Sequence, residues 1–165
     1  MAGDAILASG GDAKAAEEAL FELYEDTDYS ISILYADADE ICIAVYPDII
    51  KDSVGKDLSV YGTDEAYYAG RDIALTNYQL LESGFYSSVL SMPLYDDGKF
   101  AGYISDELDL TKMMDKVEVE LRSDFGYSLW VVEPSGMSCV ASKACTYSGR
   151  YGAYLPWRGA ARAGC

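Results

Sequence analysis

One arginine and one glutamate stand out as the residues best able to hold a charged ligand. Arg71 is the only arginine between residues 1 and 121, and it closely follows Tyr67 and Tyr68. A guanidinium group can hold a carboxylate through two parallel hydrogen bonds. Glu107 could hold the cationic or hydroxyl group of the same molecule. The alternative for Arg71 is an ordinary surface ion pair with Asp72 or a nearby glutamate.

Tyrosine is unusually frequent, with 15 in the chain. Its ring has a broad apolar face and one polar tip, which suits the wall of a small-molecule pocket and equally suits the edge of a core. Serines accompany the tyrosines in the segment before Glu107. The predicted ligand-binding residues are Tyr67, Tyr68, Arg71, Tyr86, Ser88, Tyr103, Ser105 and Glu107.

Catalysis is disfavoured by the residue types. The chain has no histidine, so it lacks the commonest general base, and no Ser-His-Asp or Cys-His nucleophile can be built. Acidic clusters such as Asp37/Asp39/Glu40 and Asp96/Asp97 fall in expected turns, where Asp supports the turn itself. No calcium loop, zinc spacing or Gly-rich phosphate loop is present. We therefore expect neither an enzyme nor a bound metal or cofactor.

The net charge of the chain limits the classes of partner that it can bind. With 28 acidic against 12 basic residues, the net charge is -16, which argues against nucleic acid because binding it needs clustered cations. No apolar run approaches the ~18 residues that span a bilayer. The composition changes after Glu133, since residues 134–165 hold no acid and four bases. We expect residues 146–165 to be an atypical tail that adds little to the fold.

The apolar pattern predicts the elements that must position these residues. Residues 12–25 repeat apolar side chains at helical spacing, with Asp12 as N-cap, and residues 2–9 are expected to extend this helix upstream. Residues 31–46 alternate as a hairpin that ends at Pro47. A polar connector follows over 48–62, and then a helix over 63–82.

A second hairpin, 85–108, is the clearest local signal, because Asp97-Gly98 is a preferred type I′ turn pair. Counting outward from that turn sets Tyr95 opposite Phe100. It also places one group of residues on a single face: Tyr86, Ser88, Leu90, Met92, Tyr103, Ser105 and Glu107. A helix over 111–121, a strand over 127–133 and a sixth strand from about Met137 complete the chain. This order predicts an α+β fold with a five- or six-stranded antiparallel sheet, an N-terminal helix and flanking helices.

Several strings in this order resemble the Cache domains, the PAS-like extracytoplasmic sensor modules of receptor kinases and chemoreceptors. The opening hairpin, the Val54-Gly55-Lys56-Asp57-Leu58-Ser59 connector, the central hairpin with its turn from Pro93 to Gly102, and the strand with its turn over 130–136 carry the resemblance. It covers about residues 14–136. The turn at Asp39-Glu40 departs from the usual Asp/Asn-Gly, and the chain after Gly136 departs entirely.

The resemblance implies an N-terminal helix over 1–28 and a sensor domain over 29–145. It implies an extracytoplasmic domain of a receptor that binds a small polar metabolite, such as an amino acid, an amine or a small carboxylate. Glu107 lies where amino-acid-binding relatives look like they carry an Asp for the ligand amine. We expect membrane attachment only through segments absent from this chain, and possible dimerisation through the N-terminal helix. The alternatives are a ligand-free dimerisation module, which would carry an apolar plug in the pocket, and a cytoplasmic PAS-like domain.

Overall fold

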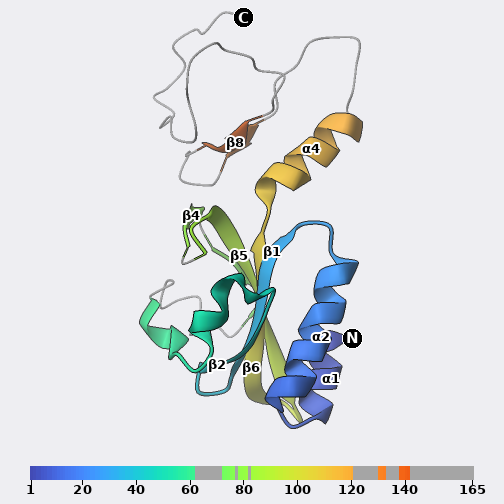
Figure 1. Ribbon diagram of the computed structural model, residues 1–165, viewed down its shortest axis with the longest axis vertical. Coiled ribbons are helices and arrows are strands. Elements are labelled where there is room, and N and C mark those ends of the chain that lie inside the picture. The colour runs from blue at the N-terminus through green and yellow to red at the C-terminus, as the bar shows by residue number, and fades with distance from the viewer. Residues whose placement is uncertain (62–71, 77, 82, 121–129, 133–137, 142–165) are drawn as a thin grey trace, which may run out of the picture. The chain divides into compact units, whose positions relative to one another are not determined.

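A computed structural model describes residues 1–61, 72–76, 78–81, 83–120, 130–132 and 138–141 of the chain (Figure 1). The chain divides into two units, Met1–Asp109 and Leu110–Cys165, each of which is described by itself. The first unit contains the helices and the sheet on which the candidate site lies.

Two helices open the first unit, where the sequence predicted one with a possible extension. Helix α1 spans Ala2–Ala8 and α2 spans Ala13–Asp26. Gly10 and Gly11 separate them with φ angles of 69° and 77°, a left-handed backbone that glycine adopts without steric cost. Asp12 caps α2 as predicted, since its carboxylate accepts a hydrogen bond from the Ala15 backbone nitrogen at 3.0 Å.

The main sheet is antiparallel, in the order β2-β1-β6-β5-β3, with β4 also paired to β5. Its long strands are the two predicted hairpins: β1 (Ser30–Asp37) with β2 (Cys42–Tyr46), and β5 (Tyr86–Asp96) with β6 (Lys99–Leu108). Asp97 and Gly98 both have positive φ, which is the geometry that a type I′ turn requires. The predicted α+β class with a five- or six-stranded antiparallel sheet is confirmed.

The predicted helix over 63–82 is wrong in the part that the structure describes. Ala74–Leu75 form strand β3 and Gln79–Leu80 form β4. Both pair with β5, and Thr76 reinforces the pairing because its backbone nitrogen donates to the Val89 carbonyl at 2.9 Å. The open edge of β5 offers unpaired backbone groups, and satisfying them outweighs local helix propensity. The connector before this region contains two short 3-10 helices, η1 (Asp48–Ser53) and η2 (Leu58–Tyr61).

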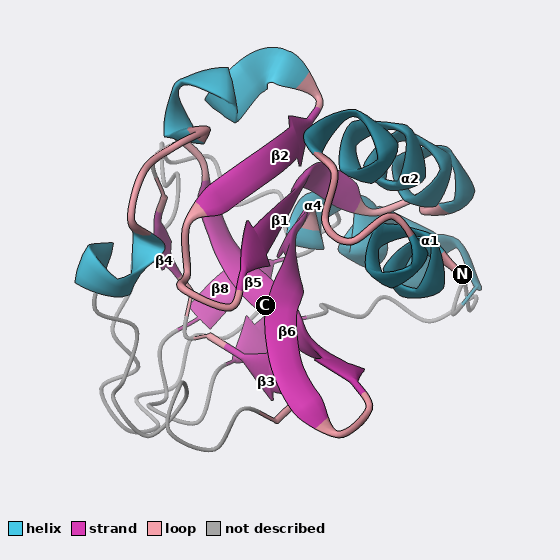
Figure 2. Ribbon diagram, turned by 90° about the horizontal axis from the view of Figure 1, so that it is seen from below, coloured by secondary structure: helices cyan, strands magenta, loops and turns pink. Residues whose placement is uncertain are grey.

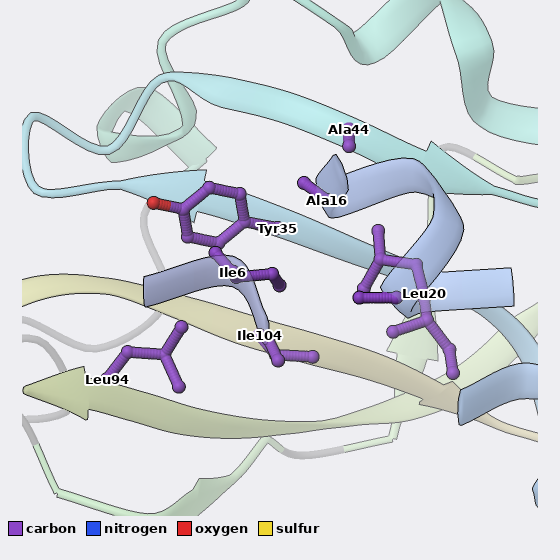
Figure 3. Packing of buried hydrophobic residues seen from close by; sticks show 9 residues of the cluster. Ile6, Ala16, Leu20, Tyr35, Ala44, Leu94 and Ile104 are labelled. Atoms are coloured by element: carbon purple, nitrogen blue, oxygen red, sulfur yellow. The ribbon is translucent and has the colours of Figure 1, made fainter. Parts of the chain in front are cut away.

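The core lies between the two helices and one face of the sheet. Ile6 and Leu20 are fully buried against Ile33, Tyr35 and Ile104 of the central strands (Figure 3). Alternate residues of these strands therefore face α1 and α2, and the residues between them face the other way. Figure 2 shows α1 and α2 next to each other on one side of the sheet.

The second unit contains helix α4 (Leu110–Glu120) and strands β7 (Trp130–Val132) and β8 (Ser138–Ala141). The helix and both strands agree with the predicted ranges 111–121, 127–133 and a start near 137. The two strands pair with each other in a sheet of their own, so they are not the outer strands of the main sheet. The strands that pair with the outer side of β5 in the main sheet are β3 and β4.

Candidate functional site

A β-bulge decides which side chains share a face of the sheet. Tyr95 lies opposite Phe100, as predicted, but the pairing then shifts by one residue and Leu94 lies opposite Gly102. Ala101 is the extra residue of β6. Beyond the bulge, the predicted pairs are therefore wrong by one position: Ser91, and not Leu90, lies opposite Ser105. A one-residue shift exchanges the two faces of a strand, because side chains alternate with a period of two.

The predicted site consequently separates into two sets. Tyr103, Ser105 and Glu107 of β6 lie on the face away from α1 and α2. Tyr86 and Ser88 of β5 lie on the opposite face, so their predicted grouping with Glu107 is wrong. Ser88 is buried there, whereas Tyr86 is 40% exposed and its ring lies against that of Tyr78, with centroids 6.0 Å apart. The predicted residues Tyr67, Tyr68 and Arg71 lie outside the described residues.

The face away from the helices carries a compact group of buried polar side chains, which we call the polar face. Cross-strand pairing sets Ser32 of β1 beside Glu107, and Ser91 of β5 beside Ser105. The hydroxyls of Ser91 and Ser105 are hydrogen-bonded to each other. The five residues that make up the polar face are each at most 7% exposed. They are Ser32, Ser91, Tyr103, Ser105 and Glu107.

Glu107 is the charged member of the polar face and is only 5% exposed. The Ser32 hydroxyl donates a hydrogen bond to one carboxylate oxygen at 2.8 Å, and the Ser83 hydroxyl donates to the other. None of the ion pairs within the described residues includes this carboxylate. Burying a carboxylate without a cation is costly, and two neutral donors compensate only part of that cost. Such a group is a candidate for binding a ligand.

Three polar-face contacts escaped the sequence prediction. Ser32 alternates with isoleucines in its strand, which is a signal that it faces away from the core, but its meeting with Glu107 depends on strand order. Ser91 is absent from the predicted face because a register without the bulge puts Leu90 in its place opposite Ser105. Ser83 reaches Glu107 from the turn between β4 and β5, and no local pattern predicts that contact.

Asp106 lies directly behind Glu107, on the helix side of β6. Burial, opposed by a hydrogen bond from Ser30 and aided by the nearby charge of Glu107, raises the pKa of its carboxyl to about 6. Its Oδ1 atom is shielded from solvent and has no hydrogen-bond partner within the described residues. Two adjacent acidic residues thus occupy opposite faces of one strand.

A separate hollow of about 350 Å³ lies beside α2 and β2, away from Glu107, where Lys14 and Lys51 are among its lining residues. Both lysines pair with acids, Glu18 and Asp48, and the lining also includes Glu17. In the described part of the chain, no group of three potential metal ligands comes together, and no helix is long and apolar enough to cross a bilayer.

Comparison with known proteins gives matches in structure alone. No family model and no curated protein matches the sequence. An extracellular ligand binding receptor from Desulfohalobium retbaense matches with a TM-score of 0.67 and 20% identity, over 79% of this chain and 24% of that one. The ligand-binding domain of the Pseudomonas fluorescens chemoreceptor CtaA, in complex with L-serine, matches with a TM-score of 0.61 and 18% identity, over 84% and 59%.

The sensor domain of the V. cholerae histidine kinase DctB also matches, with a TM-score of 0.57 and 13% identity, over 84% of this chain and 52% of that one. The fold is that of Cache-type sensor domains. The chain spans between about a quarter and three fifths of these matched chains. In this Cache-type fold, the polar face lies on the side of the sheet opposite the N-terminal helices.

Proposed function

We propose that this chain is a ligand-sensing domain of a signal-transduction receptor, and that its polar face binds a small metabolite through an ammonium group. The observation that carries the proposal is the buried Glu107 carboxylate, which has two serine donors and no cation within the described residues. An ammonium group supplies both the missing charge and further N–H donors. Its binding would turn a costly buried charge into a compensated pair.

The hydroxyls around Glu107 support a polar ligand rather than a purely apolar one. Ser105 and Ser91 can each donate or accept hydrogen bonds, so together they can serve a ligand hydroxyl or carboxylate. We further propose that Arg71, with Tyr67 and Tyr68 beside it, meets an anionic group at the other end of the ligand. L-serine, the ligand in the CtaA structure, carries both an ammonium and a carboxylate group.

The ligand-free alternative is disfavoured by the polar face itself. A module that only dimerises has no need for a buried carboxylate, and its pocket position would be filled by apolar side chains. Here that face carries Ser32, Ser105 and Glu107 instead. The fold shared with an extracellular ligand binding receptor supports a position on the extracytoplasmic side of a membrane.

Thermal unfolding with matched compound pairs tests the proposal. Each pair differs only in the amine: L-serine against D-glycerate or L-glycerate, and 4-aminobutyrate against butyrate. A ligand present at 100 times its dissociation constant adds about 2.7 kcal/mol to the stability of the folded state. For a domain of this size, the melting temperature should rise by roughly 5–10 °C. We expect hits only among compounds that carry the amine.

Substitutions then locate the site. Glu107→Gln keeps the size of the side chain but removes its charge and replaces one acceptor oxygen with an NH2 donor, and it should abolish the shift. Glu22→Gln, at an exposed position of α2, is the matched control and should not. Ser91→Ala should weaken the shift, whereas Ser88→Ala, in the same strand but on the opposite face, should leave it intact. Equal hits from amine-free carboxylates, or hits that survive Glu107→Gln, would contradict the proposal.

A further inference from the structure

A chain of hydroxyl groups links the last turn of α2 to strand β6. The Thr27 hydroxyl lies 2.9 Å from the Leu23 carbonyl and 3.2 Å from the Tyr24 carbonyl, both in the last turn of the helix. The hydroxyls of Thr27 and Ser30 are 2.9 Å apart, and Ser30 Oγ is 2.9 Å from Asp106 Oδ2. This hydroxyl relay ends at Asp106, directly behind Glu107.

Counting protons shows that the relay has two states. It contains three contacts: Leu23 to Thr27, Thr27 to Ser30, and Ser30 to Asp106. When Asp106 is ionised, the two hydroxyls supply only two protons, so one contact lacks a hydrogen bond. When Asp106 is protonated, the carboxyl donates to Ser30, Ser30 donates to Thr27, and Thr27 donates to the helix carbonyl. All three contacts are then hydrogen bonds.

We propose that Asp106 is a proton switch: its protonated form completes the relay and fastens the last turn of α2 to β6, and a cation bound at Glu107 drives the proton off. The first half of this inference depends only on the structure. The second half rests on the proposed function, since it takes the ligand to be cationic. Ligand binding on one face of the sheet thereby changes a helix contact on the other.

The charges near Asp106 support the switch. Across the sheet its neighbours are Ile33 in β1 and Leu90 in β5, which are uncharged. The elements packed around it hold two bases, Lys14 in the first turn of α2 and Lys99 at the start of β6, each at the opposite end of its element from the relay. The end of α2 and the following loop carry only acidic or phenolic groups, namely Glu22, Tyr24, Glu25, Asp26, Asp28 and Tyr29.

Glu107 is therefore the charge that a ligand can change. The burial of Asp106 and, to a smaller extent, the negative charge of Glu107 raise the pKa of Asp106 to about 6, against the hydrogen bond from Ser30. Neutralising Glu107 must lower that pKa, because the repulsion is removed. By reciprocity, a cation binds more tightly when Asp106 is ionised than when it is protonated. The affinity for the ligand should therefore fall as the pH drops below about 6.

Carbon-13 NMR titration of the full chain between pH 4.8 and 8.5 tests the switch without any ligand. We expect the Asp106 carboxyl to titrate near pH 6, and the Leu23 carbonyl shift to follow the same curve. Glu107→Gln should lower the midpoint by roughly 0.5–1 pH unit, the size expected for two charges on opposite faces of a strand. Ser30→Ala should raise the midpoint and uncouple Leu23. Ser91→Ala, a neutral change on the polar face, should leave both unchanged.

The wild-type titration needs no variant to fold, so the proposal stays testable in every case. An Asp106 midpoint near that of a free aspartate, or a midpoint insensitive to Glu107→Gln, would overturn it. If an amine hit is found, its dissociation constant should rise roughly 2.5–5-fold between pH 7.5 and 5, because at pH 5 only part of the effect of a 0.5–1 unit midpoint shift has developed. If a ligand binds but the Asp106 titration is coupled to neither Glu107 nor Leu23, the switch is contradicted and the proposed function is not. If that coupling is found but no amine binds, the proposed function is contradicted and the ligand-free half of the switch is not.

Discussion

Replacing Gly102 by alanine tests the close contact on which the face of Glu107 depends. Gly102 has a φ of +129°, which L side chains rarely adopt, and it lies opposite both Asp37 and Leu94 at the bulge. An added Cβ would lie 3.0 Å from backbone atoms of Asp37 and closer still to the carbonyl oxygen of Ala36. Both neighbours belong to the backbone of β1, which cannot move aside without displacing a central strand.

Two costs add in this variant. The unfavourable backbone conformation costs about 1–3 kcal/mol for a residue other than glycine. Forcing a methyl group against a strand backbone costs about another 1–3 kcal/mol. We expect the free energy of unfolding to fall by about 3–5 kcal/mol in total. At roughly 2–4 °C per kcal/mol for a domain of this size, the melting temperature should fall by roughly 6–20 °C.

Thermal unfolding followed by circular dichroism measures the effect, and Gly98→Ala is the matched control. Gly98 also has a positive φ, of 76°, but an added Cβ meets no atom within 4 Å. Its substitution should therefore cost only backbone strain, about 1–2 kcal/mol. Equal losses in the two variants would show that β1 and β6 do not approach as closely as the structure has them.

Three further predictions follow from the described residues and the composition of the chain. Because Asp106 binds its proton more tightly in the folded state, its stabilising contribution is present below about pH 4 and lost as the pH rises through about 6. Asp106→Asn should thus raise the free energy of unfolding by about 1–3 kcal/mol at pH 7.5 and by little at pH 4, with the exposed Asp52→Asn as control; an equal gain at both pH values would contradict this. Burial raises the pKa of Cys42 to about 11, so peptide mass spectrometry should find it unmodified by iodoacetamide at pH 8 until the protein unfolds. Deleting residues 146–165 should leave the melting temperature nearly unchanged, and a loss of more than about 2 kcal/mol would show that the tail packs.

Local signals predicted the framework of this fold. The Asp12 cap and the Asp97-Gly98 turn each act through the backbone of a few neighbouring residues, and both were readable in the sequence. The alternating strands were equally clear, because one face of each must be apolar to cover the core. Glu107 and Ser105 were correctly grouped for the same reason, since they are two residues apart in one strand.

The features that the sequence did not predict depend on contacts between residues far apart in the chain. The bulge exists where Gly102 lets the backbone of β1 approach, and a glycine inside a strand is a recognised signal for such a contact. Had Gly102 been taken as the sign of a bulge, the predicted set of residues on the polar face would have included Ser91 and excluded Ser88. The strands β3 and β4 form because β5 has an open edge, which their own sequence does not reveal. Ser83 meets Glu107 only through that pairing.

A crystal structure of the full chain with an amine from the screen is the most direct test of the central claim. The account predicts the ligand nitrogen within about 3.2 Å of a Glu107 carboxylate oxygen, on the face away from α1 and α2. A ligand seated instead in the hollow beside Lys14 and Lys51, or a Glu107 side chain turned away from the bound amine, would contradict it.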